Sequence, residues 1–146
     1  MTAPVPAPAL DGPWTVDEEI PGRRARRLCL PDGLPVEIER CVAGRLQQAY
    51  PVGAHDCEIR VRGTNASDRL AVALREVASA VLAADPRCRR VVYAASPQQP
   101  VHAEAAKAAG FRFTVEVDVP ETVELFVREP GWVTEGDSQL DDVPGS

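Results

Sequence analysis

Apolar and polar residues change their spacing several times between residues 57 and 128, and each change predicts a different element of structure. Over residues 57–62 apolar and charged side chains alternate, and this period of two is typical of a strand with one buried face. From residue 68 the apolar positions recur at intervals of four, three and four, which predicts an amphipathic helix of four or more turns. Ser67 or Asp68 would cap its start, and Asp85-Pro86 would end it. The apolar positions are Leu70, Leu74, Val77 and Val81.

The residues that follow predict a buried strand, a short helix and two further strands. Residues 91–95 are continuously apolar, as in a central strand that is covered on both faces. Pro100 opens an alanine-rich helix, and Gly110 stands where a helix end needs a left-handed residue. Residues 112–119 and 122–128 each alternate with a period of two, so they predict two strands that pair antiparallel or, across a wider turn, lie further apart. We therefore expect an α/β (α+β) fold in which a mixed sheet is flanked by helices.

The first half of the chain carries weaker signals. Short strands are expected near residues 14–18 and 26–30, and the turn-forming residues 31–33 end the second of them. Pro35 is predicted to begin a helix that continues through Leu46, because the apolar residues between them fall roughly at helical spacing.

Length and composition indicate a single globular domain. A chain of 146 residues with 45% hydrophobic and 26% charged residues is long enough to bury one core. Residues 1–13 are rich in proline and residues 134–146 are acidic and small, so both ends are expected to be flexible tails around a domain at residues 14–133.

The formal net charge of -6 argues against a nucleic-acid binder, which needs cations to replace phosphate counterions. No apolar run approaches the roughly 18 residues of a membrane span, and the N-terminus does not resemble a secretory signal, which favours the cytoplasm. A local basic run would meet a phosphate, an acidic partner or only water. It consists of Arg23, Arg24, Arg26 and Arg27.

The four cysteines show no metal-binding spacing. None of them forms a C-x-x-C pair, and only two histidines are available to join them, so no metal site is expected. Buried or half-buried thiols are the default expectation in a protein that is not secreted. The cysteines are Cys29, Cys41, Cys57 and Cys88.

The order of elements from Cys57 to Pro130 resembles the second half of the GCN5-related N-acetyltransferases. In that family the strand before the long helix ends in a Q/R-x-x-G-x-G/A loop, and the short helix that follows the central strand ends in Gly-Phe. Here Arg62-Gly63-Thr64-Asn65-Ala66-Ser67 occupies the place of the loop, and Gly110-Phe111 keeps the ending. The resemblance implies an acyl-CoA N-acyltransferase-like fold with a mostly antiparallel sheet.

The resemblance also implies a site for acetyl-CoA or another acyl-CoA. The loop and the helix that it opens would grip the pyrophosphate, because free backbone N–H groups and the helix dipole attract anions. Arg62 fits the motif, whereas Asn65 and Ser67 stand where two small residues belong. Arg69 would add positive charge, and Thr64 and Ser67 would add hydroxyl donors. The alternative is an ordinary capped turn between a strand and a helix.

The residues expected to carry acyl transfer are less regular. Ala106 occupies the position at which the family places the tyrosine that protonates the departing thiolate. His102 and Tyr93 are the candidate substitutes for that acid, although a surface histidine and a packed tyrosine are the ordinary roles of such residues. Glu58 is the candidate base, with Asp56 as the second choice. The ordinary alternative for Glu58 is a strand carboxylate that faces solvent.

Three hypotheses for the function follow. The first is an acyltransferase that carries an acyl group from acyl-CoA to an amine acceptor. The second is a non-catalytic module of the same fold that binds a protein partner or a ligand, and the third is an unrelated α/β domain with the same order of elements. The region before Cys57 is short for an acceptor wall, so a partner or a second subunit would complete it, and the strands near the C-terminus are compatible with a homodimer.

Overall fold

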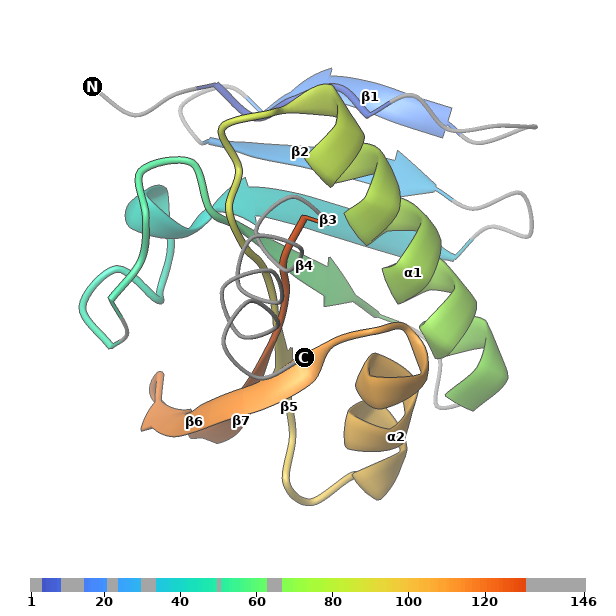
Figure 1. The fold of residues 1–146 in the computed structure, drawn as a ribbon, viewed down its shortest axis with the longest axis vertical. Coiled ribbons are helices and arrows are strands. Elements are labelled where there is room, and N and C mark those ends of the chain that lie inside the picture. The colour runs from blue at the N-terminus through green and yellow to red at the C-terminus, as the bar shows by residue number, and fades with distance from the viewer. Residues whose placement is uncertain are drawn as a thin grey trace, which may run out of the picture.

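A computed structural model describes residues 4–8, 15–20, 24–29, 34–49, 51–62 and 67–130 of the chain. The described residues form seven strands, two α-helices and one 3-10 turn (Figure 1). In chain order these are β1 (Thr15–Glu19), β2 (Ala25–Cys29), β3 (Pro35–Arg40), η1 (Cys41–Ala43), β4 (Cys57–Val61), α1 (Ser67–Ala84), β5 (Val91–Ala95), α2 (Pro100–Ala108), β6 (Arg112–Asp118) and β7 (Thr122–Arg128).

The strands form one mixed sheet in the order β1-β2-β3-β4-β5-β7-β6. Neighbouring strands are antiparallel except for β4 and β5, which run parallel because α1 crosses over between them. The predicted fold class, a mixed and mostly antiparallel sheet with helices, is confirmed. Both described helices lie on one face of the sheet (Figure 1), since their buried residues share one core cluster.

The prediction of a helix between Pro35 and Leu46 is wrong. Pro35–Arg40 is strand β3, which pairs with β2 on one side and β4 on the other. Val36 and Ile38 face the buried side of this strand, a spacing of two that the helical interpretation overlooked. Two neighbouring strands supply backbone partners along β3, and this tertiary pairing decides the conformation.

The first half is a three-stranded antiparallel meander. The two weak strands expected there are confirmed as β1 and β2, each within one residue of its predicted bounds. Only residues 20–24 connect them, which leaves no room for a helix. Among the described residues no α-helix precedes β4, so the helix-free face of β2, β3 and β4 has no helical cover.

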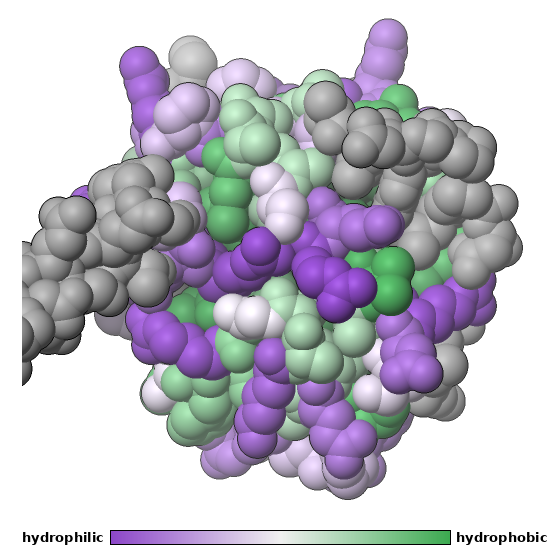
Figure 2. Space-filling view, turned by 45° about the vertical axis from the view of Figure 1, so that its right-hand side comes forward, coloured by the Kyte–Doolittle hydropathy of each residue, from purple (hydrophilic) through white to green (hydrophobic). Residues whose placement is uncertain are grey.

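The predicted amphipathic helix is confirmed as α1, an 18-residue helix. Its four predicted apolar positions are at most 1% exposed and pack on the sheet. Neither described helix is long and apolar enough to cross a membrane. Figure 2 shows hydrophilic residues interspersed with small apolar patches over the face that it presents.

Gly110 follows α2 with a φ of 92°, in the left-handed region predicted for it. The N–H groups of Gly110 and Phe111 then bond back to the carbonyls of Lys107 and Ala106 and close the helix end. Phe111 is 4% exposed and packs in the main core cluster. The Gly-Phe pair thus ends the helix and anchors the chain that leads into β6.

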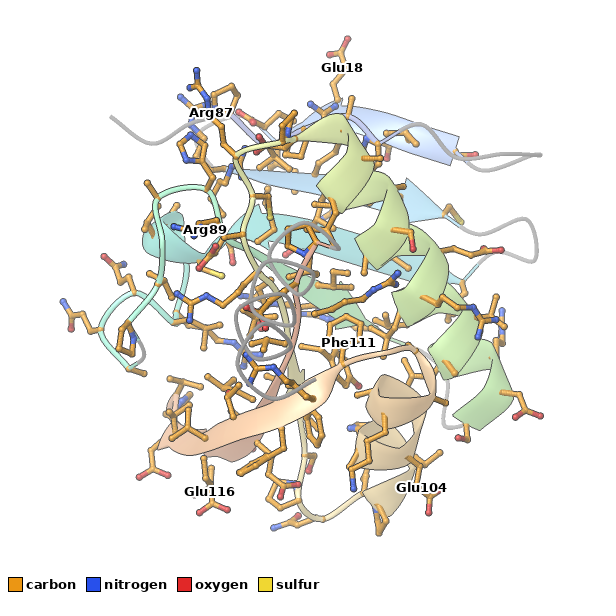
Figure 3. The ribbon with its side chains drawn as sticks, in the orientation of Figure 1. Glu18, Arg87, Arg89, Glu104, Phe111 and Glu116 are labelled. Carbon is orange, nitrogen blue, oxygen red and sulfur yellow. The ribbon has the colours of Figure 1, made fainter. Side chains whose placement is uncertain are left out.

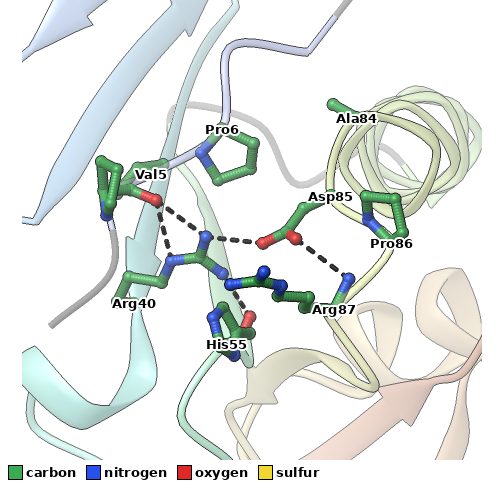
Figure 4. A pocket seen from close by; sticks show the side chains of 9 residues that line it. Val5, Pro6, Arg40, His55, Ala84, Asp85, Pro86 and Arg87 are labelled. Carbon is green, nitrogen blue, oxygen red and sulfur yellow. Dashed lines mark hydrogen bonds and ion pairs between the residues drawn. The ribbon is translucent and has the colours of Figure 1, made fainter.

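Residues 4 and 5 of the N-terminal segment pack against the strands and the end of α1. Val5 is 2% exposed, and its N–H donates to Glu19. The guanidinium of Arg40, itself 2% exposed, donates to the carbonyl of Pro4 at 2.7 Å and to Asp85 at 2.6 Å, and it also bonds the carbonyl of His55 (Figure 4). Arg40 thereby joins four distant parts of the chain.

The carboxylate of Asp85 is held by this arrangement at the end of α1. Burial alone would raise the pKa of Asp85, but the Arg40 guanidinium and the N–H of Arg87 outweigh burial and lower it. A hollow of about 370 Å³ adjoins these residues, and it lies at the opposite end of α1 from Ser67.

Candidate functional site

Strands β4 and β5 pair over only three residues and then separate. Cys57, Glu58 and Ile59 lie beside the first three residues of β5. Beyond Ile59, β4 continues to follow β3 as far as Val61, while β5 continues to follow β7 as far as Ala95. Each strand therefore stays with its outer neighbour, and an opening remains in the middle of the sheet.

A cavity of about 240 Å³ lies at this opening. Both separating strands line it, together with α2 and one residue from the segment after η1. Three of the lining side chains are arginines, and none is a carboxylate, so an anionic or polar ligand suits the cavity better than a cation. The lining residues are Arg45, Ile59, Arg60, Val61, Arg62, Tyr93, Ala94 and His102.

The structure brings together three of the residues that the sequence selected, namely Arg62, Tyr93 and His102. The rings of Tyr93 and His102 meet edge to face, with centroids 6.3 Å apart. Burial raises the pKa of Tyr93, so its hydroxyl keeps its proton at neutral pH. The N–H of Ser96 donates to Nδ1 of His102 at 3.3 Å, which leaves the neutral ring with its proton on Nε2.

Solved structures of acetyltransferases share this architecture. The aminoglycoside acetyltransferase AAC(6')-Ib in complex with coenzyme A matches with a TM-score of 0.62 and 12% identity, over 72% of this chain and 66% of that one. A structure of AAC(6')-Ib with ribostamycin and coenzyme A matches with a TM-score of 0.62 and 14% identity, over 72% of this chain and 64% of that one. This chain has the GCN5-related N-acetyltransferase fold. It spans just under two thirds of the length of these structures.

Comparisons at the level of sequence find no counterpart. No protein-family model matches the chain, and no curated protein is similar to it at a significant level. At 12–14% identity the structural match shows the acetyltransferase fold alone.

Within the acetyltransferase fold, Glu58 is enclosed on the helix-free face of β4. The alternative that Glu58 faces solvent is wrong, because the residue is 1% exposed. Its carboxylate lies 2.7 Å from Arg45 and 3.3 Å from Arg60, and these two arginines, rather than Glu58, line the opening. The strand therefore has a second buried face, which a strict alternation with one buried side did not predict.

Asp56 has a structural position at the start of β4. It is 1% exposed and accepts the N–H groups of Gly53 at 2.8 Å and Arg90 at 3.1 Å. Arg90 also pairs with its carboxylate at 3.3 Å. These bonds tie the segment before β4 to the segment before β5, at the end of the strands where they remain paired.

The phosphate-loop residues are described only at their edges. Arg62 is exposed, Ser67 is the first residue of α1, and Arg69 is half-buried in its first turn. Gly63, Thr64, Asn65 and Ala66 lie outside the described residues. The N-terminus of α1 thus follows the separating end of β4 after five residues, of which Arg62 is described.

Ala106, in the position of the family's tyrosine, is fully buried in the core cluster formed by both helices. It presents no hydroxyl to the cavity, so a proton donor there must come from another residue. Among the described residues that line the cavity, Tyr93 with its hydroxyl and His102 with its imidazole are the ones that could donate a proton to a leaving group.

Sequence reasoning missed Arg45 and Arg60 as lining residues. Arg60 was placed correctly on the polar side of its strand, so the alternation in residues 57–62 carried a signal for it. Arg45 lies after η1, in a region predicted to be helical, and nothing in its local pattern indicates that it reaches Glu58. Its position depends on the chain returning over the sheet.

No group of three or more His, Cys, Asp or Glu side chains within the described ranges is arranged to hold a metal ion. Cys41, Cys57 and Cys88 are buried and Cys29 is half-buried, in agreement with the default expectation for the thiols. Burial raises the pKa of Cys41, and a hydrogen bond with Cys57 together with burial raises that of Cys88.

The histidine of the cavity is expected to make stability depend on pH. Burial lowers the pKa of His102 below its unfolded value of about 6.5, so the unfolded chain binds a proton more readily. The contribution of His102 is complete above that value and is lost as the pH falls through the lower folded pKa. Urea unfolding between pH 7.5 and 5.5 should show falling stability, and His102→Gln should flatten the profile. An unchanged slope in the variant would contradict this assignment.

Proposed function

We propose that this chain is an acyl-CoA-dependent N-acyltransferase that transfers an acetyl or other acyl group to an amine. The observation that carries the proposal is the separation of β4 from β5 beyond Ile59, beside the N-terminus of α1. The structural neighbours are acetyltransferases in complex with coenzyme A, which supports the same ligand class for this opening.

The separated strands suit the arm of acyl-CoA for a physical reason. Where β4 and β5 part, the backbone groups that face the opening have no partner among the described strands, and an extended ligand with amide groups can bond to them as an added strand does. The pyrophosphate would lie toward the N-terminus of α1, with Arg62 as a cationic neighbour. Gly63 to Ser67 and Arg69 complete the proposed phosphate site.

The proposed reaction is a direct attack of the amine on the thioester. The nitrogen forms a bond to the carbonyl carbon, the C–S bond breaks, the ammonium loses a proton and the thiolate gains one. We assign to Tyr93 the role of donating the proton that the sulfur receives. Its raised pKa keeps the hydroxyl protonated, and His102 is its neighbour. Glu58 remains the candidate base, and that role requires Arg45 to release its carboxylate.

A non-catalytic binding module is the second candidate. Two observations favour it: Ala106 replaces the tyrosine and is buried, and the carboxylate of Glu58 is engaged by two arginines. Such a module would use the same opening for a ligand or a protein partner without acyl transfer. Under this alternative Tyr93→Phe changes no turnover, because there is none, whereas the acyltransferase loses protonation of the departing thiolate.

Calorimetric titration of acetyl-CoA and free coenzyme A tests the proposal. Both should bind saturably, and the double variant Arg62→Ala, Ser67→Asp should weaken binding at least about tenfold, because it removes a cation and places a carboxylate at the helix N-terminus. Arg87→Ala is the matched control, since Arg87 is exposed at the far end of α1 (Figure 3). No heat and no thermal shift at high ligand concentration would refute the acyltransferase.

A further inference from the structure

A second cluster of arginines lies on the helix-free face of the sheet, next to the opening. Arg27 on β2 stands opposite Glu37 on β3, and Glu37 stands opposite Arg60 on β4, so the three side chains form a row across the strands. Together with Arg62 they line a hollow of about 270 Å³, here called the arginine cavity. Its lining residues are Arg27, Pro35, Val36, Glu37, Arg60 and Arg62.

The positive charge in the arginine cavity is only partly neutralised. Arg60 pairs with Glu39 at 2.7 Å, Glu58 at 3.3 Å and Glu37 at 3.5 Å, so carboxylates of the protein neutralise its charge. Arg27 and Arg62 are exposed, and the side chain of neither makes an ion pair or a hydrogen bond with a described residue. Arg62 is the cation proposed above for the pyrophosphate, so the guanidinium of Arg27 remains for a second anionic ligand.

The basic run in the sequence divides between the two faces of β2. Arg24 pairs with Glu19, and Arg26 donates to the carbonyls of Asp17 and Val5, so both serve the packing of β1 and the N-terminal segment. Arg27 alternates to the other face and joins the arginine cavity. Of the described members of the run, Arg27 is the one that the fold does not use.

The arginine cavity is continuous with the proposed acyl-CoA site. Arg60 and Arg62 line both hollows, so the arginine cavity adjoins the opening between β4 and β5 and extends from it toward Arg27. A guanidinium presents a planar fork of donors that matches a carboxylate, which an ammonium group cannot do. Arg27 lies on β2, two strands from β4, so the cavity offers recognition of an anionic group on the side of the opening away from β5.

We propose that the arginine cavity binds the carboxylate of the acceptor, so that the acceptors of this chain are amines that carry a carboxylate group. This inference rests on the proposed acyltransferase function. The antibiotic in the structural neighbour named with ribostamycin is an aminoglycoside, a polyamine without a carboxylate. With the side chain of Arg27 unpaired among the described residues, the present cavity repels such a polycation and selects an acceptor of the opposite charge.

The test compares amines that differ only in the carboxylate. The protein is saturated with free coenzyme A, which forms an unreactive complex, and L-amino acids with acidic, aliphatic, aromatic and basic side chains are titrated by calorimetry beside their carboxamides. At least one acid should bind roughly tenfold more tightly than its carboxamide. Arg27→Gln should remove that difference, and Arg87→Gln, which removes an exposed charge at a distance, should keep it.

The outcomes separate this inference from the function on which it rests. If coenzyme A binds and no acid exceeds its carboxamide, or if the preference survives in Arg27→Gln, the acceptor assignment is wrong while the acyl-CoA site stands. If coenzyme A itself fails to bind, the proposed function is refuted and the acceptor role with it. With acetyl-CoA, the same preference for the acid should appear in kcat/KM. It should appear even though a larger fraction of the carboxamide's amine is unprotonated, and so able to attack, at neutral pH.

Discussion

Replacing Arg40 with methionine should lower the free energy of unfolding by about 3–5 kcal/mol, the range for removing one partner of a buried ion pair. Arg40 is 2% exposed, and its loss leaves Asp85 without its cation and the carbonyls of Pro4 and His55 without a donor. Methionine keeps much of the side-chain volume, so the effect reports the polar contacts more than a cavity. Urea unfolding at pH 7 measures it.

Arg112→Met is the matched control for Arg40. Arg112 pairs with Glu129 at 2.6 Å, but its side chain is 62% exposed, and exposed pairs contribute at most about 1 kcal/mol. If the two variants lose the same stability, the N-terminal segment is not held by Arg40 as the structure indicates. Asp85→Asn provides a milder second variant, because it retains a hydrogen-bond acceptor for Arg40.

Glu58→Ala should cost about 2–3 kcal/mol, less than the loss of Arg40. Glu58 is 1% exposed and joins Arg45 to Arg60, so its removal leaves both arginines short of an anion. The loss is smaller because Arg60 keeps Glu39 and Glu37, and because the side chain of Arg45, 37% exposed, can turn to water. Thermal and urea unfolding measure the change.

Glu116→Ala on β6 is the strand control for Glu58. Glu116 is exposed and points away from the sheet (Figure 3), so its loss should change stability by no more than about 0.5 kcal/mol. Glu58→Gln separates structure from chemistry, since the amide keeps the shape but cannot accept a proton from an amine. An equal effect of Glu58→Ala and Glu116→Ala on stability would contradict the enclosed position of Glu58.

The second half of the fold could be predicted because its signals are local. The helix from Ser67, the buried strand at Val91 and the glycine at position 110 each follow from short-range patterns that tertiary contacts reinforce. The match to acetyltransferase structures agrees with the resemblance carried by Arg62 and Gly110-Phe111. Periodicity, capping and turn chemistry were sufficient for these elements.

The first half depends on contacts between distant residues, and local patterns misled there. Val36 and Ile38 are two residues apart, as in a strand, whereas the apolar residues after them fall roughly at helical spacing, and pairing with β2 and β4 decides between the two. The enclosure of Glu58 arises because Arg45 returns over the sheet from another segment. Likewise, only the register of three strands places Arg27, Glu37 and Arg60 in one row.

The reactivity of the buried thiols reports whether the part of the molecule around them opens. Cys41, Cys57 and Cys88 lie at the end of the sheet where β4 and β5 stay paired, and each is at most 1% exposed. A thiol reagent can reach these three cysteines only when that end of the molecule opens locally or the whole domain unfolds. Ligand entry at the separated end would leave them unmodified. The rate at which these three thiols are alkylated therefore distinguishes a local widening of the opening between β4 and β5 from global unfolding, and no engineered cysteine is needed.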